Sequence, residues 1–539
     1  MNAKHFSLLC CFLTLFSVVI GIITIATTSV PYVSAFDWGI ASKLPPFYWV
    51  GLFSIFGLTY ISRTSKKWLT VVFLLAILYL FIVPVAIQEN ATLLGISYPS
   101  SEGKLIGVTG HLIEDKSSIY KYHNFPGFLY LTAILTSVTG IPLTLLCKYA
   151  PIFLVVLLSL IVYLILRVKL RAPESIMGAM WFLGSWWWIA GNYFSPQAVS
   201  SVLFALAFLI FTWLSFGRKP QNRSLGILFI ILVVSIVFSH PFTSIMLISC
   251  FIPLLLVQRW KTSGLIMSLL LLTLELSFLF LWAFPFAEYA ISTTLQQVPN
   301  LLSSQFGRAQ LIGSLPQIST NLSRYLIMIT NVSVCLVFIA LSILKPLKDK
   351  EKYWLLSIAG MCLPIAVTTY GMSETIIRVF EFALIPLTYL CVRLFAKKPR
   401  LLAVLVCMLF LVHIPAHYGG ATVEGVATSG IAGASFYLDY VPRNVPYFSL
   451  TLKPTFLMWF QEPYSVEPPL STNILLPINE TAIAADLEQS KFVIYSQGDI
   501  NEYIYYHGES PLQRSVLEGQ FDHFYDNSYV QLFFNASKS

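Results

Sequence analysis

The sequence predicts an α-helical polytopic membrane protein of about 13 transmembrane helices, followed by a small C-terminal extracytoplasmic domain that is α/β or β-rich. Hydrophobic residues make up 57% of the 539 residues and charged residues only 11%, a composition far more apolar than that of a soluble globular protein. The apolar residues fall in runs of roughly 16 to 25, about what a helix needs to cross a bilayer. Such runs are too continuous for barrel strands, so we expect helical spans.

The first apolar run, Leu8 to Ala26, follows Lys4 and could be mistaken for a secretory signal. It is longer than a usual signal core and lacks a convincing cleavage site followed by a soluble domain, so we expect a retained first span. The expected spans lie at about 7 to 28, 46 to 62, 68 to 88, 150 to 167, 175 to 191, 196 to 216, 225 to 239, 241 to 257, 264 to 284, 326 to 345, 354 to 371, 377 to 396 and 401 to 416.

Lysine and arginine in short loops mark the cytoplasmic side of a membrane protein. All basic clusters fall on one side only if the apolar stretch 126–146 does not cross, so we expect an interfacial helix there, broken around Gly140, Pro142 and Pro151. The basic residues of these clusters are Arg63, Lys66, Lys67, Arg167, Lys169, Arg171, Arg218, Lys219, Arg223, Arg259, Lys261, Lys345, Lys348, Lys350, Lys352, Lys397, Lys398 and Arg400. This topology predicts a multi-pass protein of the plasma membrane with a cytoplasmic N-terminus and an outer C-terminus.

The chain divides into a membrane domain, 1–418, which contains a polar external loop at 89–125, and an extracytoplasmic domain, 419–539. In the second domain, short runs of β-branched and aromatic residues alternate with Pro, Asn, Gly and Asp turns, which is typical of strands. The expected strands are Ser449 to Leu452, Phe492 to Tyr495, Tyr503 to Tyr506 and Tyr529 to Phe534. The net charge of +8 comes from short juxtamembrane clusters and forms no extended patch, so no nucleic-acid partner is expected.

The polar external loop is the first place to look for chemistry. It carries the carboxylates Glu102, Glu114 and Asp115, and a carboxylate near a membrane surface can act as a general base or hold a divalent cation. For each of them, a plain solvated loop charge is the competing interpretation. His111 and His123 flank the carboxylates, but their spacing fits no zinc motif.

Two ionisable groups at the outer ends of spans also stand out. His240 interrupts about 30 residues of nearly unbroken apolar sequence, and such a group is costly there unless it is paired or faces a cavity. It either orients a substrate or caps the helix that begins at Pro241. Arg378 follows Glu374 and precedes Glu381 at helical spacing. This favours a structural salt bridge, or an arginine that binds a phosphate with Glu381 orienting it.

An aromatic group precedes the segment NYFSPQ. An interfacial belt is the favoured interpretation, and a wall of an acceptor or sugar pocket is the alternative. The group consists of Trp181, Trp186, Trp187, Trp188 and Tyr193. Glycine-rich phosphate loops, nucleophile elbows and nucleotide-binding fingerprints are absent from the sequence, so a mechanism driven by a cytosolic nucleotide is not expected.

These segments occur in a recognisable order. A polar external loop with acids is followed by YHNFPGF, VTGIP, NYFSPQA and SHPFTS, then by an arginine with glutamates at the start of a late span, and the tail contains FDHFYDNSYVQLFF. The order resembles archaeal and bacterial polytopic glycosyltransferases of the GT-C superfamily, which includes dolichyl-phosphate-mannose-dependent and oligosaccharide-transferring enzymes.

The resemblance implies an inverting glycosyltransferase that moves a sugar from a polyprenyl (dolichyl) phosphate donor to a lipid-linked glycan or protein acceptor at the outer face of the membrane. It implies an acidic residue of the first long external loop as catalytic base or metal ligand. Glu102, Asp37 and Asp115 are the candidates, and no DxD motif is present. Glu102 and Asp115 would hold a divalent cation, Mg or Mn, if one is used.

The resemblance assigns the other candidate residues to two groups. The donor phosphate and its lipid are assigned to Arg378, His240 and His123, and the acceptor or sugar pocket to His111, Tyr193, Gln197 and Glu374. A polytopic transporter or lipid flippase is the main rival, because intramembrane ionisable groups and Pro or Gly breaks also serve transport. We find no two similar halves, however, and the unusual groups gather on one face. A non-enzymatic assembly or receptor subunit is a third alternative without positive support.

Overall fold

The structure is a computed structural model. It describes residues 3–27, 41, 43–87, 98–112, 121–186, 193–216, 223–257, 273, 276–277, 349–362, 372–418, 428–442, 445–449, 458, 486–487, 489–496, 500, 517–518, 521–527 and 530–534. In these ranges the chain is mostly helical, with a small sheet near the C-terminus. The expected spans 264–284 and 326–345 lie almost wholly outside the described residues.

The N-terminal helices pack as one unit. They are α1 (Ala3–Ala26), α2 (Pro46–Ser62), α3 (Lys66–Phe81) and the short α4 (Val83–Ile87). The hydroxyl of Tyr79 on α3 donates a hydrogen bond to the backbone oxygen of Tyr48 over 2.7 Å. A side chain at Gly21 of α1 or Gly51 of α2 would overlap this hydroxyl. The two glycines therefore let three helices meet around one buried phenol.

The remaining helices are α6 (Tyr98–Thr109), α7 (Gly127–Thr139), α8 (Leu143–Arg167), α9 (Ala172–Ser185), α10 (Pro196–Phe216), α11 (Arg223–Ser239), α12 (Pro241–Val257), α17 (Asp349–Met361), α19 (Met372–Phe395), α20 (Pro399–Tyr418) and α22 (Thr428–Tyr440), with a 3-10 helix, η2 (Lys121–Asn124), before α7. The break that was expected around Gly140 and Pro142 lies between α7 and α8. Gly140 ends α7 at a φ of 68°, which favours glycine, and Pro142 precedes α8. Pro151, which was expected to contribute to the break, lies inside α8.

Three helical stretches in the described part of the chain are long and apolar enough to cross a membrane: Leu8–Ala26, Leu143–Arg167 and Pro196–Trp213. Several shorter apolar helices accompany them, among them Pro46–Ser62 and Pro399–Pro415. The number of about 13 spans stays a prediction. The expected bounds 46–62 and 196–216 nevertheless coincide with α2 and α10.

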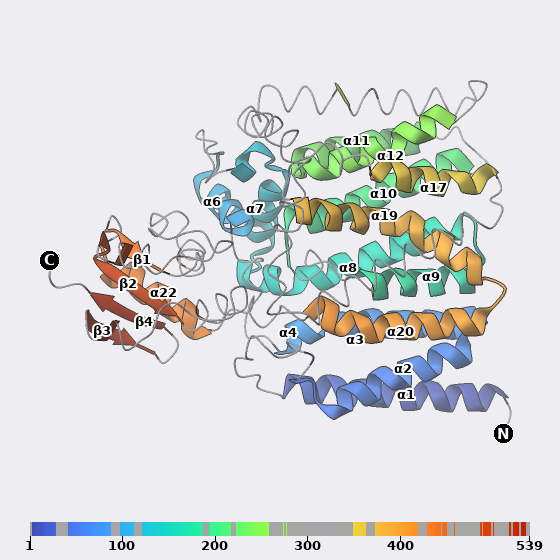
Figure 1. Ribbon diagram of the computed structural model, residues 1–539, viewed down its shortest axis with the longest axis horizontal. Coiled ribbons are helices and arrows are strands. Elements are labelled where there is room, and N and C mark those ends of the chain that lie inside the picture. The colour runs from blue at the N-terminus through green and yellow to red at the C-terminus, as the bar shows by residue number, and fades with distance from the viewer. Residues whose placement is uncertain are drawn as a thin grey trace, which may run out of the picture.

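The long helices run side by side as a bundle, with the N-terminus at one end and the C-terminal sheet beyond the other (Figure 1). Helices α6 and α7 lie at the end of the bundle that faces the sheet, and the connection from α19 to α20 lies at the opposite end. Residues 98–109 of the expected external loop form helix α6. This helix packs against α7, which ends at Thr139. The helical hairpin of α6 and α7 and the basic connection at 396–398 therefore lie at opposite ends of the bundle.

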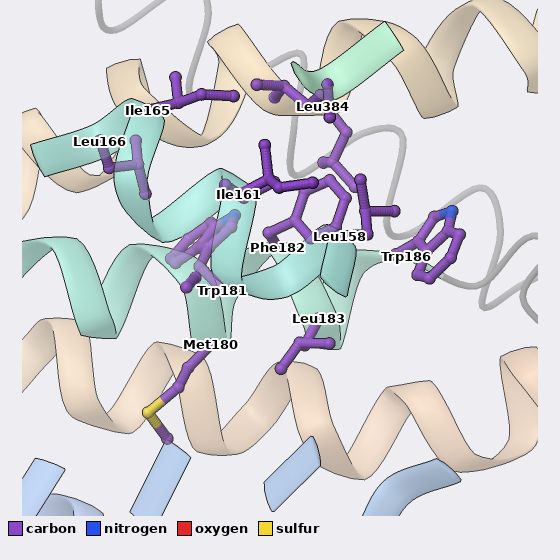
Figure 2. Close-up of a cluster of buried hydrophobic side chains, with 14 of the residues drawn as sticks. Leu158, Ile161, Ile165, Leu166, Met180, Trp181, Phe182, Leu183, Trp186 and Leu384 are labelled. Carbon is purple, nitrogen blue, oxygen red and sulfur yellow. The ribbon is translucent and has the colours of Figure 1, made fainter. Parts of the chain in front are cut away.

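The centre of the bundle is an apolar core between α8, α9 and α19. Figure 2 shows Leu158 and Ile161 of α8 against Phe182 of α9, with Leu384 of α19 close by. Gly178 and Gly184 let neighbouring helices approach α9, because a side chain at these positions would meet Leu166 and Leu409 respectively. Residues 175–185 of α9 are therefore buried, and the C-terminal end of this helix packs against α20 at Gly184.

The C-terminal sheet has the order β1-β2-β4-β3. Its strands are β1 (Tyr447–Phe448), β2 (Phe492–Ser496), β3 (Asp522–Asp526) and β4 (Val530–Phe534). Strands β1 and β2 are parallel and the other pairs are antiparallel. The strands expected near 492–495 and 529–534 are confirmed, whereas the first strand lies slightly before its expected position and 503–506 is outside the described residues. With α22, this part of the chain has α/β character.

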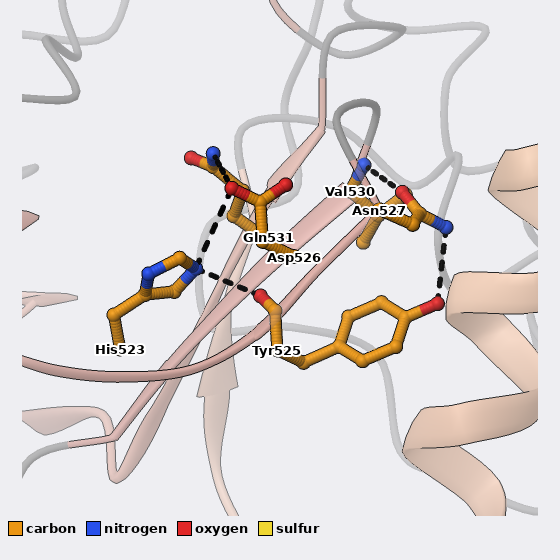
Figure 3. Close-up of polar contacts among 6 residues, drawn as sticks. All are labelled: His523, Tyr525, Asp526, Asn527, Val530 and Gln531. Atoms are coloured by element: carbon orange, nitrogen blue, oxygen red, sulfur yellow. Dashed lines mark hydrogen bonds and ion pairs between the residues drawn. The ribbon is translucent and has the colours of Figure 1, made fainter.

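The hairpin of β3 and β4 is fixed to α22 by Asn527. Its Oδ1 accepts a hydrogen bond from the Val530 backbone over 2.7 Å, and its Nδ2 donates to the Tyr525 hydroxyl over 3.0 Å (Figure 3). The same Nδ2 donates to the Ser429 backbone oxygen on α22 over 2.7 Å. One apolar cluster joins this domain to the membrane helices and includes Ile106, Phe128, Tyr437 and Ile494. The sheet and α22 therefore pack against the α6–α7 end of the bundle.

Candidate functional site

Glu102 of α6 and His123 of η2 form a buried pair, called the hairpin pair below. Their Oε2 and Nε2 atoms are 3.5 Å apart, and both side chains are 0% exposed. The burial follows from the close approach of α6 and α7, because a side chain at Gly103 would lie 2.7 Å from the Cβ of Thr132. Since an isolated buried carboxylate is costly, the imidazole stabilises Glu102 and holds it toward η2.

His240 occupies the tight turn between α11 and α12. Its Nδ1 lies 2.9 Å from the Thr243 hydroxyl and accepts a hydrogen bond from the Thr243 backbone N–H over 3.3 Å, which caps α12. Burial, and then the charge of Arg378, lower the pKa of His240 to about 3. The side chain is therefore neutral near pH 7, with its proton on Nε2. The capping interpretation is observed, and Nε2 keeps a proton with which to bind a substrate.

Arg378 and Glu381 lie one turn apart on α19. Arg378 is within electrostatic range of both His240 and Glu381, and its guanidinium carbon is 6.0 Å from the ring centroid of Phe242. Arg378 keeps some exposure, whereas Glu381 is 5% exposed. The cation is thus the member of the pair that a ligand can reach.

The carboxylate of Glu381 accepts a hydrogen bond on each oxygen. Trp186 Nε1 donates to Oε1 over 2.8 Å, and Gln197 Nε2 donates to Oε2 over 2.9 Å. These donors come from the end of α9 and the first turn of α10. The bundle cluster, as it is called below, consists of Glu381, Trp186, Gln197, His240 and Arg378.

The hairpin pair and the bundle cluster are joined through the start of α7. A side chain at Gly127 would lie 2.6 Å from the Ser239 hydroxyl and 3.1 Å from backbone atoms of Phe238. The chain after His123 therefore presses directly against the residues that precede His240. Both groups lie at the end of the bundle that faces the C-terminal sheet (Figure 1).

Several candidates from the sequence cannot be placed. Asp37 and Asp115 lie outside the described residues, as does Glu114. Glu374 lies in the first turn of α19, four residues before Arg378, and the structure describes only its place in that helix. Their assigned roles stay predictions.

The structure describes the surroundings of three other candidates, His111, Tyr193 and Gln197. His111 is exposed just after α6, where its Nδ1 lies 2.9 Å from the Thr109 backbone oxygen. Tyr193 is half-buried and precedes Phe194, whose ring lies 4.7 Å from that of Phe128. Gln197 is 4% exposed and is directed to Glu381.

Trp186 contacts Glu381, which the sequence interpretation did not predict. It was grouped with the aromatic residues of an expected interfacial belt, yet Trp186 is 3% exposed and Trp181 is 1% exposed. The belt interpretation is wrong for these two residues, because both indoles pack inside the bundle. The position of Trp186 just before the polar segment NYFSPQ is the one signal that could have suggested its role.

A metal site from the described residues alone does not fit. Glu102 and His123 offer two donor groups, and no group of three or more His, Cys, Asp or Glu side chains gathers within the described ranges. The predicted second ligand, Asp115, lies outside the described residues, so the cation site of Glu102 and Asp115 stays a prediction.

No family model matches the chain, and no curated protein matches it either. Among solved structures, it is similar to the oligosaccharyltransferase of Archaeoglobus fulgidus tethered with an acceptor peptide. The TM-score is 0.52 and the identity 14%, over 88% of this chain and 75% of that one. The chain shares the fold of this enzyme.

Two further oligosaccharyltransferase structures from the same archaeon agree. The complex with Zn and sulfate gives a TM-score of 0.51 at 15% identity, over 87% of this chain and 73% of that one. The complex of AglB with an inhibitory peptide and a dolichol-phosphate gives 0.50 at 13% identity, over 89% and 75%. The resemblance to GT-C glycosyltransferases that the sequence suggested is confirmed at the level of the fold.

Proposed function

We propose that this protein is a polytopic membrane glycosyltransferase that moves a sugar from a polyprenyl (dolichyl) phosphate to a lipid-linked glycan or protein acceptor at the outer face of the membrane. The observation that carries the proposal is that two polar groups, Glu102 with His123 and Arg378 with His240, lie at the same end of a bundle with this fold, where the start of α7 packs against the end of α11. The similar archaeal enzyme has been seen with an acceptor peptide and with a dolichol-phosphate.

The donor phosphate would bind the exposed side of the bundle cluster. The planar guanidinium of Arg378 can hold two phosphate oxygens, and the Nε2 proton of neutral His240 can donate to a third. When the sugar leaves, negative charge grows on the phosphate, and these fixed donors stabilise that charge more than they stabilise the intact donor. His123, which is paired with Glu102, would contact the donor phosphate from the side of η2.

The acceptor would be activated by a carboxylate. Its hydroxyl proton passes to the carboxylate while the new bond to the sugar C1 forms and the bond from C1 to the phosphate oxygen breaks, which inverts the anomeric carbon. General base catalysis of this kind contributes roughly 100- to 10,000-fold in rate. Glu102 is buried against His123, so the hairpin must open for Glu102 to serve as the base. Asp37 and Asp115 stay the alternative bases.

The finer topology belongs to the proposal. We infer about 13 spans within 1–418, an extracytoplasmic domain at 419–539 and a cytoplasmic N-terminus in the plasma membrane. The position of the N-terminus and the C-terminal sheet at opposite ends of the bundle supports this orientation (Figure 1). A divalent cation, Mg or Mn, would be held by Glu102 and Asp115, with phosphate oxygens of the donor as further ligands.

Transfer from a panel of radiolabelled polyprenyl-phosphate sugars into lipid and protein fractions tests the proposal. Purified protein should incorporate label, and Arg378→Ala and Glu102→Gln should each reduce incorporation by about 100-fold or more. Matched controls are Arg63→Ala and Glu174→Gln, since Arg63 bonds its own helix at Tyr60 and Glu174 caps α9 at the Arg171 backbone. Repeating the assay with EDTA, Mg and Mn tests the cation. No incorporation from any donor would refute the glycosyltransferase and favour the transporter or flippase.

A further inference from the structure

Glu381 is held by donors that its own helix does not supply. Trp186 and Gln197 are 195 and 184 residues away in the chain, and each donates to a different carboxylate oxygen. A carboxylate that accepts a hydrogen bond on both oxygens is favoured in its ionised form, because an ionised carboxylate only accepts. The two donors therefore fix the orientation of Glu381 and, with the charge of Arg378, favour its ionised form against the cost of burial.

The position of Trp186 is set from three helices. Its backbone N–H ends α9 by donating to the Phe182 oxygen over 2.9 Å, after which the chain leaves the helix. Its ring stacks on Phe182 at 5.9 Å and contacts Phe81 of α3 at 6.3 Å. The ring of His413 of α20 contacts the same Phe81 ring at 5.2 Å. The indole is therefore aimed at Glu381 by packing that does not depend on a ligand.

Gln197 is placed by the start of α10. The Ser195 hydroxyl accepts a hydrogen bond from the Ala198 backbone over 3.0 Å and caps this helix. The first turn is thereby fixed, and the side chain of Gln197 extends from it to Glu381. Gln197 is therefore directed at Glu381 and not at the acceptor or sugar pocket to which the resemblance assigned it.

We propose that Trp186 and Gln197 are positioning residues of the donor-phosphate site, which hold Glu381 so that its charge fixes the guanidinium of Arg378 toward the phosphate. This inference rests on the proposed function. The buried anion lies behind the partly exposed cation, one turn away on the same face of α19. When one donor is lost, the carboxylate rotates or takes up a proton, and the guanidinium loses its fixed partner.

Trp186→Phe is the first test, because it removes the indole N–H and keeps an aromatic ring. We expect the KM for the polyprenyl-phosphate donor to rise about ten-fold, since a hydrogen bond to a charged group is lost. The KM for the acceptor should not change, whereas kcat at saturating donor should fall as well, because the guanidinium also stabilises the charge that develops on the leaving phosphate. Gln197→Leu should raise the donor KM similarly.

A double-mutant cycle separates positioning from general stability. Glu381→Gln should weaken donor binding, and adding Trp186→Phe to it should cause no further loss, because the indole acts through the charge of Glu381, which the first change has already removed. Trp354→Phe is the matched control: Trp354 is 2% exposed, stacks on Tyr389 at 4.5 Å and makes no hydrogen bond through Nε1 within the described structure. This control should leave the donor KM unchanged.

Direct binding of dolichyl phosphate to the full protein in nanodiscs distinguishes failure of this inference from failure of the proposed function. Binding that weakens in Trp186→Phe but not in Trp354→Phe supports the inference, even if no sugar transfer is found. Equal weakening in both variants, equal affinity in wild type and Trp186→Phe, or no binding by the wild type overturns it. Additive losses in the double-mutant cycle would also overturn it.

Discussion

The bundle cluster and the hairpin pair are built in different ways. In the bundle cluster, Glu381 receives hydrogen bonds of 2.8 and 2.9 Å from two further helices. In the hairpin pair, Glu102 faces His123 at 3.5 Å, and both belong to one segment that lies at the end of the bundle. The difference shows that packing of several helices fixes the bundle cluster, whereas the hairpin pair depends on one local segment. Under the proposed function, a preformed donor side would face an acceptor side that has to open before it acts.

The largest effect is expected where the two regions touch. In Gly127→Ala, the new methyl group would overlap the Ser239 hydroxyl and crowd the backbone of Phe238. The hairpin would then shift away from His240, and transfer should fall about 100-fold, because a misplacement of about 1 Å costs that much in a catalytic site. Initial rates at saturating donor and acceptor measure this loss.

Two variants control for the effect of the methyl group. Gly226→Ala lies on α11 with no atom within 4 Å of the added carbon, so it should keep wild-type activity. Adding Ser239→Ala to Gly127→Ala removes the closest clash and should restore part of the rate. Wild-type activity in Gly127→Ala would show that the contact of the two regions has no part in transfer.

The hairpin itself can be loosened at Gly103. In Gly103→Val, the side chain would overlap Thr132 of α7, so α6 and α7 should separate, at a cost of about 1 to 3 kcal/mol in stability. A fall in the melting temperature, together with faster hydrogen exchange limited to α6 and α7, would show a closed hairpin opening. Gly107→Ala, where the nearest atom would be at 3.4 Å, is the tolerated control. A loss of stability spread evenly over the bundle would argue against a separately opening hairpin.

The smallest effect is expected at His240, where two roles can be separated. His240→Asn keeps a side-chain acceptor for the Thr243 backbone but has no imidazole Nε2 proton, whereas His240→Ala loses both. We expect both variants to weaken dolichyl phosphate binding about five-fold, the loss of one donor. Only His240→Ala should also lose about 1 kcal/mol of stability. Unchanged binding in His240→Asn would make this histidine a helix cap alone.

Much of the helical architecture was predictable because length and hydropathy act locally. The bounds of α2 and α10, the turn at His240 and the strands near 492 and 530 follow from apolar runs, prolines and alternation in the sequence. The GT-C resemblance followed from the order of short motifs, and the shared fold supports it. The burial of Trp186 and of Glu102 was not predictable, since a polar or aromatic residue at the end of an apolar run is equally compatible with solvent, an interface or a core.

The sequence by itself determined that the chain forms long apolar helices and a small terminal sheet, because these properties depend on neighbours along the chain. Only the tertiary structure decided which side chains meet. Glu381 finds Trp186 and Gln197 across nearly 200 residues, and Glu102 finds His123 because Gly103 lets two helices approach. Such contacts depend on how helices pack in space, and spacing along the chain does not specify that packing.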